Sequence, residues 1–158
     1  MAERADERMP VRMVDVGSKP TTQREATARV ELRMRPDTLV AIDRSDMPKG
    51  DVIAAANIAG VTAAKRTWDL IPLCHQIPLS SVDLRFETRG RLGRMIITAT
   101  ARTNAPTGAE MEAMVAAAMA ALTVYDMCKG SDPGIQITNL TLVQKTGGKS
   151  GSWVRPEE

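Results

Sequence analysis

Residues 82–101 read Val-Asp-Leu-Arg-Phe-Glu-Thr-Arg-Gly-Arg-Leu-Gly-Arg-Met-Ile-Ile-Thr-Ala-Thr-Ala, and this stretch decides the fold. Apolar and polar side chains alternate along residues 82–86 and again along residues 95–101, which is the pattern of strands with one buried face. The segment between the two runs carries Gly90 and Gly93, and glycine is typical of turns. The sequence therefore predicts an antiparallel β-hairpin.

A segment with helical spacing lies on each side of the hairpin. Residues 51–70 place apolar side chains at three- and four-residue steps, which predicts a long helix that tolerates Gly60. Residues 109–129 are rich in Ala and Met and show the same spacing, and Gly130 suits the C-terminal cap of this second helix. The hairpin is therefore expected between two long helices.

Strands are predicted outside both helices, at residues 27–34 and 135–143, with a short helix opening near Pro36. The order strand, helix, strand, strand, helix, strand is that of the split βαβ, ferredoxin-like fold. We therefore predict an α+β fold in which an antiparallel sheet carries two long helices on one face. Residues 13–151 are expected to form a single catalytic domain, between a flexible N-terminal tail (1–12) and a C-terminal tail (152–158).

Composition narrows the range of partners. The chain of 158 residues has a net charge of +2, too small to indicate a surface for duplex nucleic acid, and its 3% aromatic residues are too few for a base-stacking platform. The apolar run of residues 113–122 is well short of the ~20 residues that span a bilayer. The first twelve residues are too charged for a signal-peptide core. We expect a cytoplasmic protein without nucleic-acid or membrane partners.

The metal-binding residue types are scarce. Cys74, Cys128 and the single histidine, His75, provide too few soft ligands for a zinc site, and adjacent Cys74 and His75 lack the usual ligand spacing. No cluster of aspartates resembles a calcium loop. We therefore expect neither a metal nor another cofactor.

Two segments could bind an anionic ligand. Residues 63–75 carry two cations, a carboxylate, an indole, a thiol and His75, and Pro72 places His75 beyond the end of the predicted helix. Taken alone, this segment favours a solvated basic helix face followed by a partly buried histidine. Lys49 precedes a helix start, where it could bind an anion or simply be solvated. Residues 148–150 are not part of a P-loop, because Val143 stands where that motif needs glycine.

Acidic residues lie at both ends of the second long helix. Glu110 and Glu112 occupy its first turn, where carboxylates complement the helix dipole. Asp126 lies in the last turn, against the dipole, three residues before Lys129. Asp126 and Lys129 could form a simple ion pair or an acid/base arrangement with tuned pKa values, and the sequence leaves both readings open.

Long segments of the chain resemble one family, the cyclic pyranopterin monophosphate synthases of molybdenum cofactor biosynthesis. The resemblance covers roughly residues 13–151, nearly the whole chain. It rests on the segments MVDV (13–16), KGDV (49–52), AAKRTWDLIPLCH (63–75), TGAEMEA (107–113), ALTVYDMCK (121–129) and GGKSG (147–151).

The resemblance implies a ferredoxin-like fold assembled as a hexamer, a trimer of dimers, with active sites at subunit interfaces. It implies a lyase whose substrate, 3′,8-cyclo-7,8-dihydroguanosine 5′-triphosphate, is made by an upstream radical enzyme. The reaction rearranges the purine and ribose into a pyranopterin, closes a cyclic phosphate and releases pyrophosphate.

The resemblance also implies roles for individual residues. Asp126 matches the catalytic acid/base, with Lys129 beside it and Lys49 as a further catalytic residue. The pocket and substrate contacts fall on the remaining matched positions, namely Leu73, Cys74, His75, Met111, Glu112, Lys65 and Lys145.

The chain departs from the usual family pattern at Asn57, Gln76 and residues 104–105, none of which we assign to the chemistry. The alternative is a noncatalytic nucleotide- or pterin-binding paralogue that kept the fold. Such a paralogue could lose its acid/base groups, whereas Lys49, His75, Glu112, Asp126 and Lys129 are all present.

Overall fold

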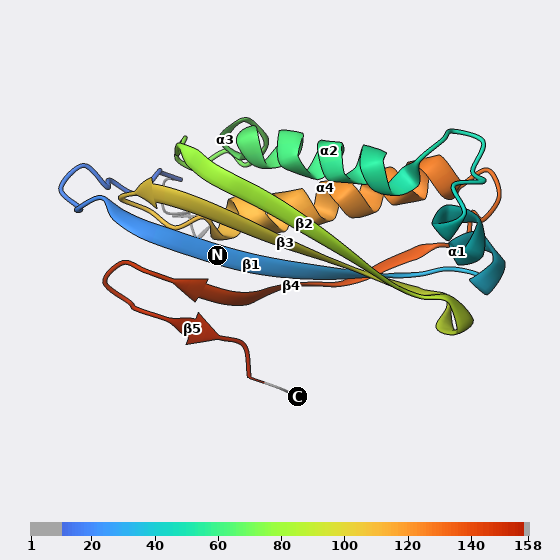
Figure 1. The fold of residues 1–158 in the computed structure, drawn as a ribbon. Helices are drawn as coiled ribbons and strands as arrows, with labels where there is room; N and C mark the ends of the chain where they lie inside the picture. Colours follow the sequence, from blue (N-terminus) through green and yellow to red (C-terminus); the bar gives the residue numbers. More distant parts are fainter. Residues whose placement is uncertain (1–10, 157–158) are drawn as a thin grey trace, which may run out of the picture.

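A computed structural model describes residues 11–156, so the predicted tail at residues 1–12 falls almost wholly outside the described residues. Figure 1 shows one long, twisted sheet with helices packed above it. The elements in chain order are β1 (Thr22–Arg33), α1 (Pro36–Asp43), α2 (Val52–Lys65), α3 (Thr67–Leu70), β2 (Leu79–Arg89), the 3-10 turn η1 (Gly90–Leu92), β3 (Arg94–Ala105), α4 (Glu110–Cys128), β4 (Gln136–Thr146) and β5 (Trp153–Val154).

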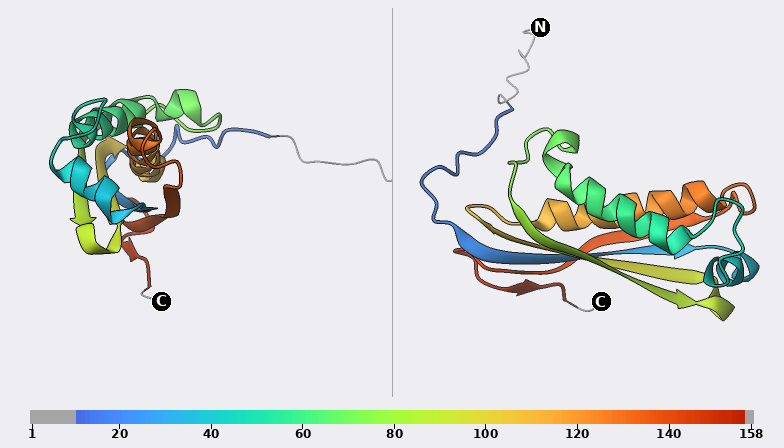
Figure 2. Two further views of the ribbon diagram at one scale, coloured as in Figure 1. Left: turned by 90° about the vertical axis from the view of Figure 1, so that its right-hand side faces the viewer. Right: turned by 45° about the horizontal axis from the view of Figure 1, so that its top comes forward.

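The sheet has the strand order β2-β3-β1-β4-β5, and each pair of neighbours is antiparallel. The predicted hairpin is β2–β3, joined through η1 and a left-handed Gly93. Helices α2 and α4 lie side by side on one face of the sheet (Figures 1 and 2). The structure thus confirms the predicted α+β, ferredoxin-like fold.

The core lies between α4 and the central strands. The inward side chains of β1, among them Val30 and Leu32, are fully buried. They face a stripe of alanines on α4, at positions 113, 116, 117, 120 and 121, all fully buried. Alanine lets a helix approach a sheet closely, so few aromatic side chains are needed to fill the space. By length and composition α4 could cross a membrane, but half of its apolar window is buried here, as in a core helix.

Three local details differ from the sequence predictions. The helix predicted over residues 51–70 breaks at Arg66 into α2 and α3, where the buried Thr67 hydroxyl donates to the carbonyls of Ala63 and Ala64. Gly130 does not adopt the left-handed backbone of a glycine cap, because Ser131 and Asp132 donate their N–H groups to the Cys128 carbonyl instead. The short strand β5 pairs with β4 within residues expected to be a tail.

Gly60 sits where α2 packs on α4 and β2. A Cβ atom there would lie 2.6 Å from Leu84 Cδ2 and 3.0 Å from the Ala116 carbonyl oxygen. We expect Gly60→Val to lower the free energy of unfolding by about 1–3 kcal/mol, because overpacking this contact forces the two helices apart. Ala54→Val, on the exposed side of α2, is the matched control and should cost only a few tenths of a kcal/mol. Equal effects in chemical denaturation would contradict the close helix contact.

Candidate active site

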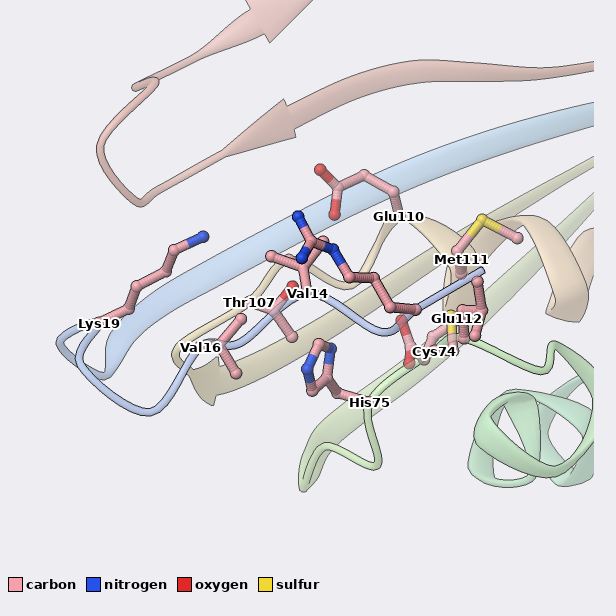
Figure 3. Close-up of a pocket in the computed structure, with 12 residues that line it drawn as sticks. Val14, Val16, Lys19, Cys74, His75, Thr107, Glu110, Met111 and Glu112 are labelled. Carbon is pink, nitrogen blue, oxygen red and sulfur yellow. The ribbon is translucent and has the colours of Figure 1, made fainter. Parts of the chain in front are cut away.

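A cavity of about 490 Å³ lies at the N-terminal end of α4. Three segments far apart in the sequence form it: the chain before β1, the connection from α3 to β2, and the first turn of α4 with the loop before it. Figure 3 shows their side chains converging on one space. Five of the predicted pocket residues line it together, namely Leu73, Cys74, His75, Met111 and Glu112.

Local sequence explains how these side chains are presented. α3 ends before Pro72, and a turn in which the Cys74 N–H donates to the Ile71 carbonyl directs Cys74 and His75 towards α4. The N-cap residue of α4, Ala109, has no side-chain group to accept from the first-turn N–H groups. The positive end of the α4 dipole therefore lies at the cavity.

Glu112 is the buried carboxyl group of this cavity, with only 4% of the residue exposed. Burial raises its pKa to about 7, with a smaller contribution from the charge of Glu110, against the effect of its own backbone N–H. Glu112 can therefore gain or lose a proton near neutral pH. Burial and the Glu112 charge also raise the pKa of the neighbouring Cys74 thiol, so Cys74 is not poised as a thiolate nucleophile.

Lys145 reaches the edge of the cavity from β4, as its Nζ lies 2.9 Å from Glu110 Oε1. The Glu110 carboxylate folds over Gly108, and a side chain at position 108 would collide with it. The predicted substrate-binding residue Lys145 is thus anchored at the start of α4, beside the pocket rather than on its wall.

Cations missed in the sequence line the space next to this cavity. Lys19 borders both the cavity and an adjoining pocket of about 740 Å³, where Arg24 and Lys149 also lie. Arg24 is fixed because it donates to the carbonyls of Ala105 (3.0 Å) and Pro106 (3.1 Å). The guanidinium also rests on Gly148, where any Cβ would collide with it. Lys19 and Arg24 carry no sequence signal, whereas Lys149 lies in the GGKSG segment (147–151) of the family resemblance; the fold brings the three together.

A second cluster lies at the other end of α4. Lys49 Nζ is 2.7 Å from Asp126 Oδ2 and 3.0 Å from the Asp126 carbonyl oxygen, and Lys129 Nζ is 2.8 Å from Asp126 Oδ1. About half of each side chain is exposed. Hydrogen bonds from Lys129 and Lys49, together with their charges, lower the pKa of Asp126 to about 2. Asp126 raises the pKa of Lys129 in return.

One continuous helix separates the two clusters. Glu112 and Asp126 are 14 positions apart on α4 (126 minus 112), which is about 21 Å along its axis at about 1.5 Å per residue. A small nucleotide cannot touch both carboxyl groups of one subunit. The last predicted contact, Lys65, is exposed at the final residue of α2 and does not line the cavity that holds His75.

Within residues 11–156, no group of three or more His, Cys, Asp or Glu side chains is placed to hold a metal ion. The described cavity and its adjoining pocket present a carboxyl group with a pKa of about 7, an imidazole, one guanidinium held by hydrogen bonds and two exposed lysines.

Comparison with known proteins shows to which family the chain belongs. The model of the MoaC family matches residues 13–148. The chain belongs to the MoaC family. The site residues predicted from the sequence, from Lys49 to Lys145, lie inside the matched range, whereas Arg12 of the cavity and Lys149 of the adjoining pocket lie just outside it.

Individual family members are similar over nearly their full length. A protein of Roseiflexus sp. (strain RS-1) is 53% identical over 149 residues, which is 94% of either chain. One from Magnetococcus marinus (strain MC-1) is 51% identical over 150 residues, 95% of this chain and 92% of that protein. One from Chloroflexus aurantiacus (strain J-10-fl) is 50% identical over 145 residues, 92% of this chain and 89% of that protein. All three are named cyclic pyranopterin monophosphate synthase.

The raised pKa of Glu112 predicts how stability depends on pH. The folded state favours the protonated carboxyl group, so its stabilising contribution is complete below about pH 4.5 and is lost as the pH rises to about 7. In Glu112→Gln this loss is absent. We expect the variant to gain roughly 3 kcal/mol at most over the unmodified protein between pH 4.5 and 7.5, measured by denaturant unfolding. The exposed control Glu87→Gln should show no such gain. A pH-independent difference for Glu112→Gln would show that folding does not raise the pKa of Glu112.

Proposed function

We propose that this protein is a cyclic pyranopterin monophosphate synthase. In this reaction 3′,8-cyclo-7,8-dihydroguanosine 5′-triphosphate is rearranged to cyclic pyranopterin monophosphate, and pyrophosphate leaves. The observation that carries the proposal is the cavity lined by Cys74, His75 and Glu112, which adjoins a pocket bordered by three cations. A partly apolar space next to fixed positive charge suits a nucleotide with a triphosphate.

The cavity and the adjoining pocket are proposed to bind different parts of the substrate. The ring system fits the first space, where the Glu112 carboxyl group, with a pKa of about 7, can either donate or accept a hydrogen bond. The triphosphate fits the second, facing Lys19, Arg24 and Lys149. These cations also stabilise the charge that grows on pyrophosphate when a ribose-derived hydroxyl attacks the α-phosphorus and the cyclic phosphate closes. Bond breakage at phosphorus without hydrolysis makes the enzyme a lyase.

Asp126, Lys129 and Lys49 are proposed to supply the proton transfers of the rearrangement. Ring opening and closure require protons to leave some atoms and reach others. Before substrate binds, Asp126 is a weak base, because the ammonium groups of Lys129 and Lys49 lower its pKa to about 2. A polyanionic substrate that draws Lys49 towards its phosphates would release Asp126 from one of these partners, so its pKa would rise as the substrate binds.

The two clusters can serve one substrate only if subunits assemble. Along α4 they are too far apart within one chain, whereas a symmetric interface brings the cavity of one subunit next to the Lys49–Asp126–Lys129 cluster of another. We therefore propose the homohexamer, a trimer of dimers, with sites at subunit interfaces. We also propose that the enzyme is cytoplasmic and receives its substrate from a radical enzyme that forms the 3′,8 bond.

The role of Asp126 is tested by Asp126→Asn, which keeps the size of the side chain but removes its basic oxygen. We expect a folded protein that binds the cyclised nucleotide and forms product about 10²–10⁴-fold more slowly, because it lacks a positioned acid/base group. Pyrophosphate release and pyranopterin formation are the measurements.

Asp83→Asn is the matched control for this variant. Asp83 is also exposed and lies 2.7 Å from a cation, Arg102, the same distance as in the Lys49–Asp126 pair. We expect near-normal turnover in this control. Near-normal turnover in Asp126→Asn itself would exclude the acid/base role, and binding without any turnover in the unmodified protein would favour the noncatalytic paralogue.

Assembly of the site from two subunits is tested by mixing Asp126→Asn with Glu112→Gln, after each variant alone has been measured to have lost turnover. In a mixed pair of subunits one site carries both changes and the other carries neither, so random re-assembly should restore about a quarter of normal turnover. Two sites that are complete within single chains would stay inactive after mixing. Full activity in a protein that sediments as a monomer would contradict the proposal equally.

A further inference from the structure

Asp132 is a buried carboxylate that lies outside both clusters. It belongs to the loop between α4 and β4, and only 4% of the residue is exposed. One of its oxygens, Oδ2, accepts from the backbone N–H of Arg35 (2.9 Å) and from the Thr38 hydroxyl (3.0 Å). The other, Oδ1, accepts from the Gly134 N–H (3.3 Å). Burial alone would raise the pKa of Asp132, but these hydrogen bonds and the Arg35 charge outweigh it and lower the pKa.

These contacts join two elements that are distant in the sequence. Arg35 and Thr38 are at the start of α1, which has no side-chain cap of its own from Arg35. Asp132 supplies a carboxylate at that helix end from another part of the chain. Arg35 strengthens the junction, because its guanidinium donates to the Ser131 carbonyl at 3.0 Å.

Each joined element is continuous with a segment that carries part of the second cluster. On one side, the Asp132 N–H donates to the Cys128 carbonyl at 2.9 Å, within three residues of both Asp126 and Lys129. On the other side, α1 leads into the loop that ends at Lys49. This loop rests on α1 through the Asp46 N–H, which donates to Ala41, and on the core through buried Met47. The junction at Asp132 therefore connects the segment that leads to Lys49 with the end of α4 that carries Asp126.

We propose that Asp132 is a positioning residue, which holds the loop of Lys49 against the end of α4 that carries Asp126 and Lys129. Its importance for catalysis rests on the proposed function, which gives those three side chains their chemistry. Its effect on the position of Lys49 does not rest on the proposed function. Among the described residues, the charged groups that contact Asp126 are Lys49 and Lys129, and the charged group that faces Asp132 is Arg35.

The test measures the Lys49–Asp126 contact directly. Lysines are labelled briefly with acetic anhydride at neutral pH, and mass spectrometry compares Lys49 with Lys65, an exposed lysine outside the cluster. In Asp132→Ala, α1 loses its anchor, so Lys49 should leave Asp126 and react about two- to fivefold faster relative to Lys65. Turnover should fall about ten- to a hundredfold, since small displacements of catalytic groups have effects of this size.

Glu31→Gln is the matched control. Glu31 is also a carboxylate that is only 4% exposed and hydrogen-bonded to two partners, Arg33 and Arg94, but it touches neither α1 nor α4. We expect the relative labelling of Lys49 to be unchanged in this variant. A milder change, Thr38→Val, removes one hydrogen bond to Asp132 and should shift labelling in the same direction by a smaller factor, even if Asp132→Ala fails to fold.

The outcomes separate the two proposals. A folded Asp132→Ala or Thr38→Val protein in which Lys49 labels as in the unmodified protein overturns the positioning role. Faster labelling of Lys49 with unchanged turnover supports the geometric role and contradicts the catalytic use of the cluster. Faster labelling with reduced turnover supports both.

Discussion

The close packing of α4 on the sheet is the constraint on which the rest of the molecule depends. A continuous stripe of buried alanines lets the helix lie flat across β1 and β3, and a helix of 19 residues spans about 28 Å. Its first turn presents Met111 and Glu112 to one cavity, and its last turn presents Asp126 and Lys129 at the opposite end. The length of the helix thus keeps the Glu112 carboxyl group and the Asp126 carboxylate of one chain about 21 Å apart along its axis.

The two ends of α4 differ in electrostatic character as well as in position. At the start, Glu112 is buried and holds its proton up to about pH 7. At the end, Asp126 is exposed, paired with two lysines and ionised down to about pH 2. A site assembled from both ends combines a carboxyl group that titrates near neutrality with a carboxylate whose basicity depends on where its lysines are. In the proposed function, substrate phosphates shift the pKa of Asp126, which would link substrate binding to proton transfer.

Much of the fold could be predicted from the sequence, because alternation and helical spacing report directly on which face of an element is buried. The hairpin of β2 and β3 and the helix α4 were both predicted in this way. The break at Arg66 was not, since it depends on the buried hydroxyl of Thr67 bonding to the preceding turn. Motifs identified Cys74, His75 and Glu112, which the structure places in one cavity, whereas Lys19 and Arg24 carry no local pattern and meet only through the tertiary fold. The contacts of Asp132 also leave no pattern in the sequence, because its hydrogen-bond partners Thr38 and Arg35 are 94 and 97 residues away.

We propose that one substrate is bound by the cavity of one subunit and the Lys49–Asp126–Lys129 cluster of another. The most direct measurement is a crystal structure of the Asp126→Asn protein with the cyclised nucleotide bound. We expect ring density against Glu112 and His75 of one chain and phosphates towards Arg24 and Lys149. Lys49 of a neighbouring chain should lie within hydrogen-bond distance of the nucleotide. A nucleotide bound only by residues of a single chain, or outside the cavity at the start of α4, would contradict it.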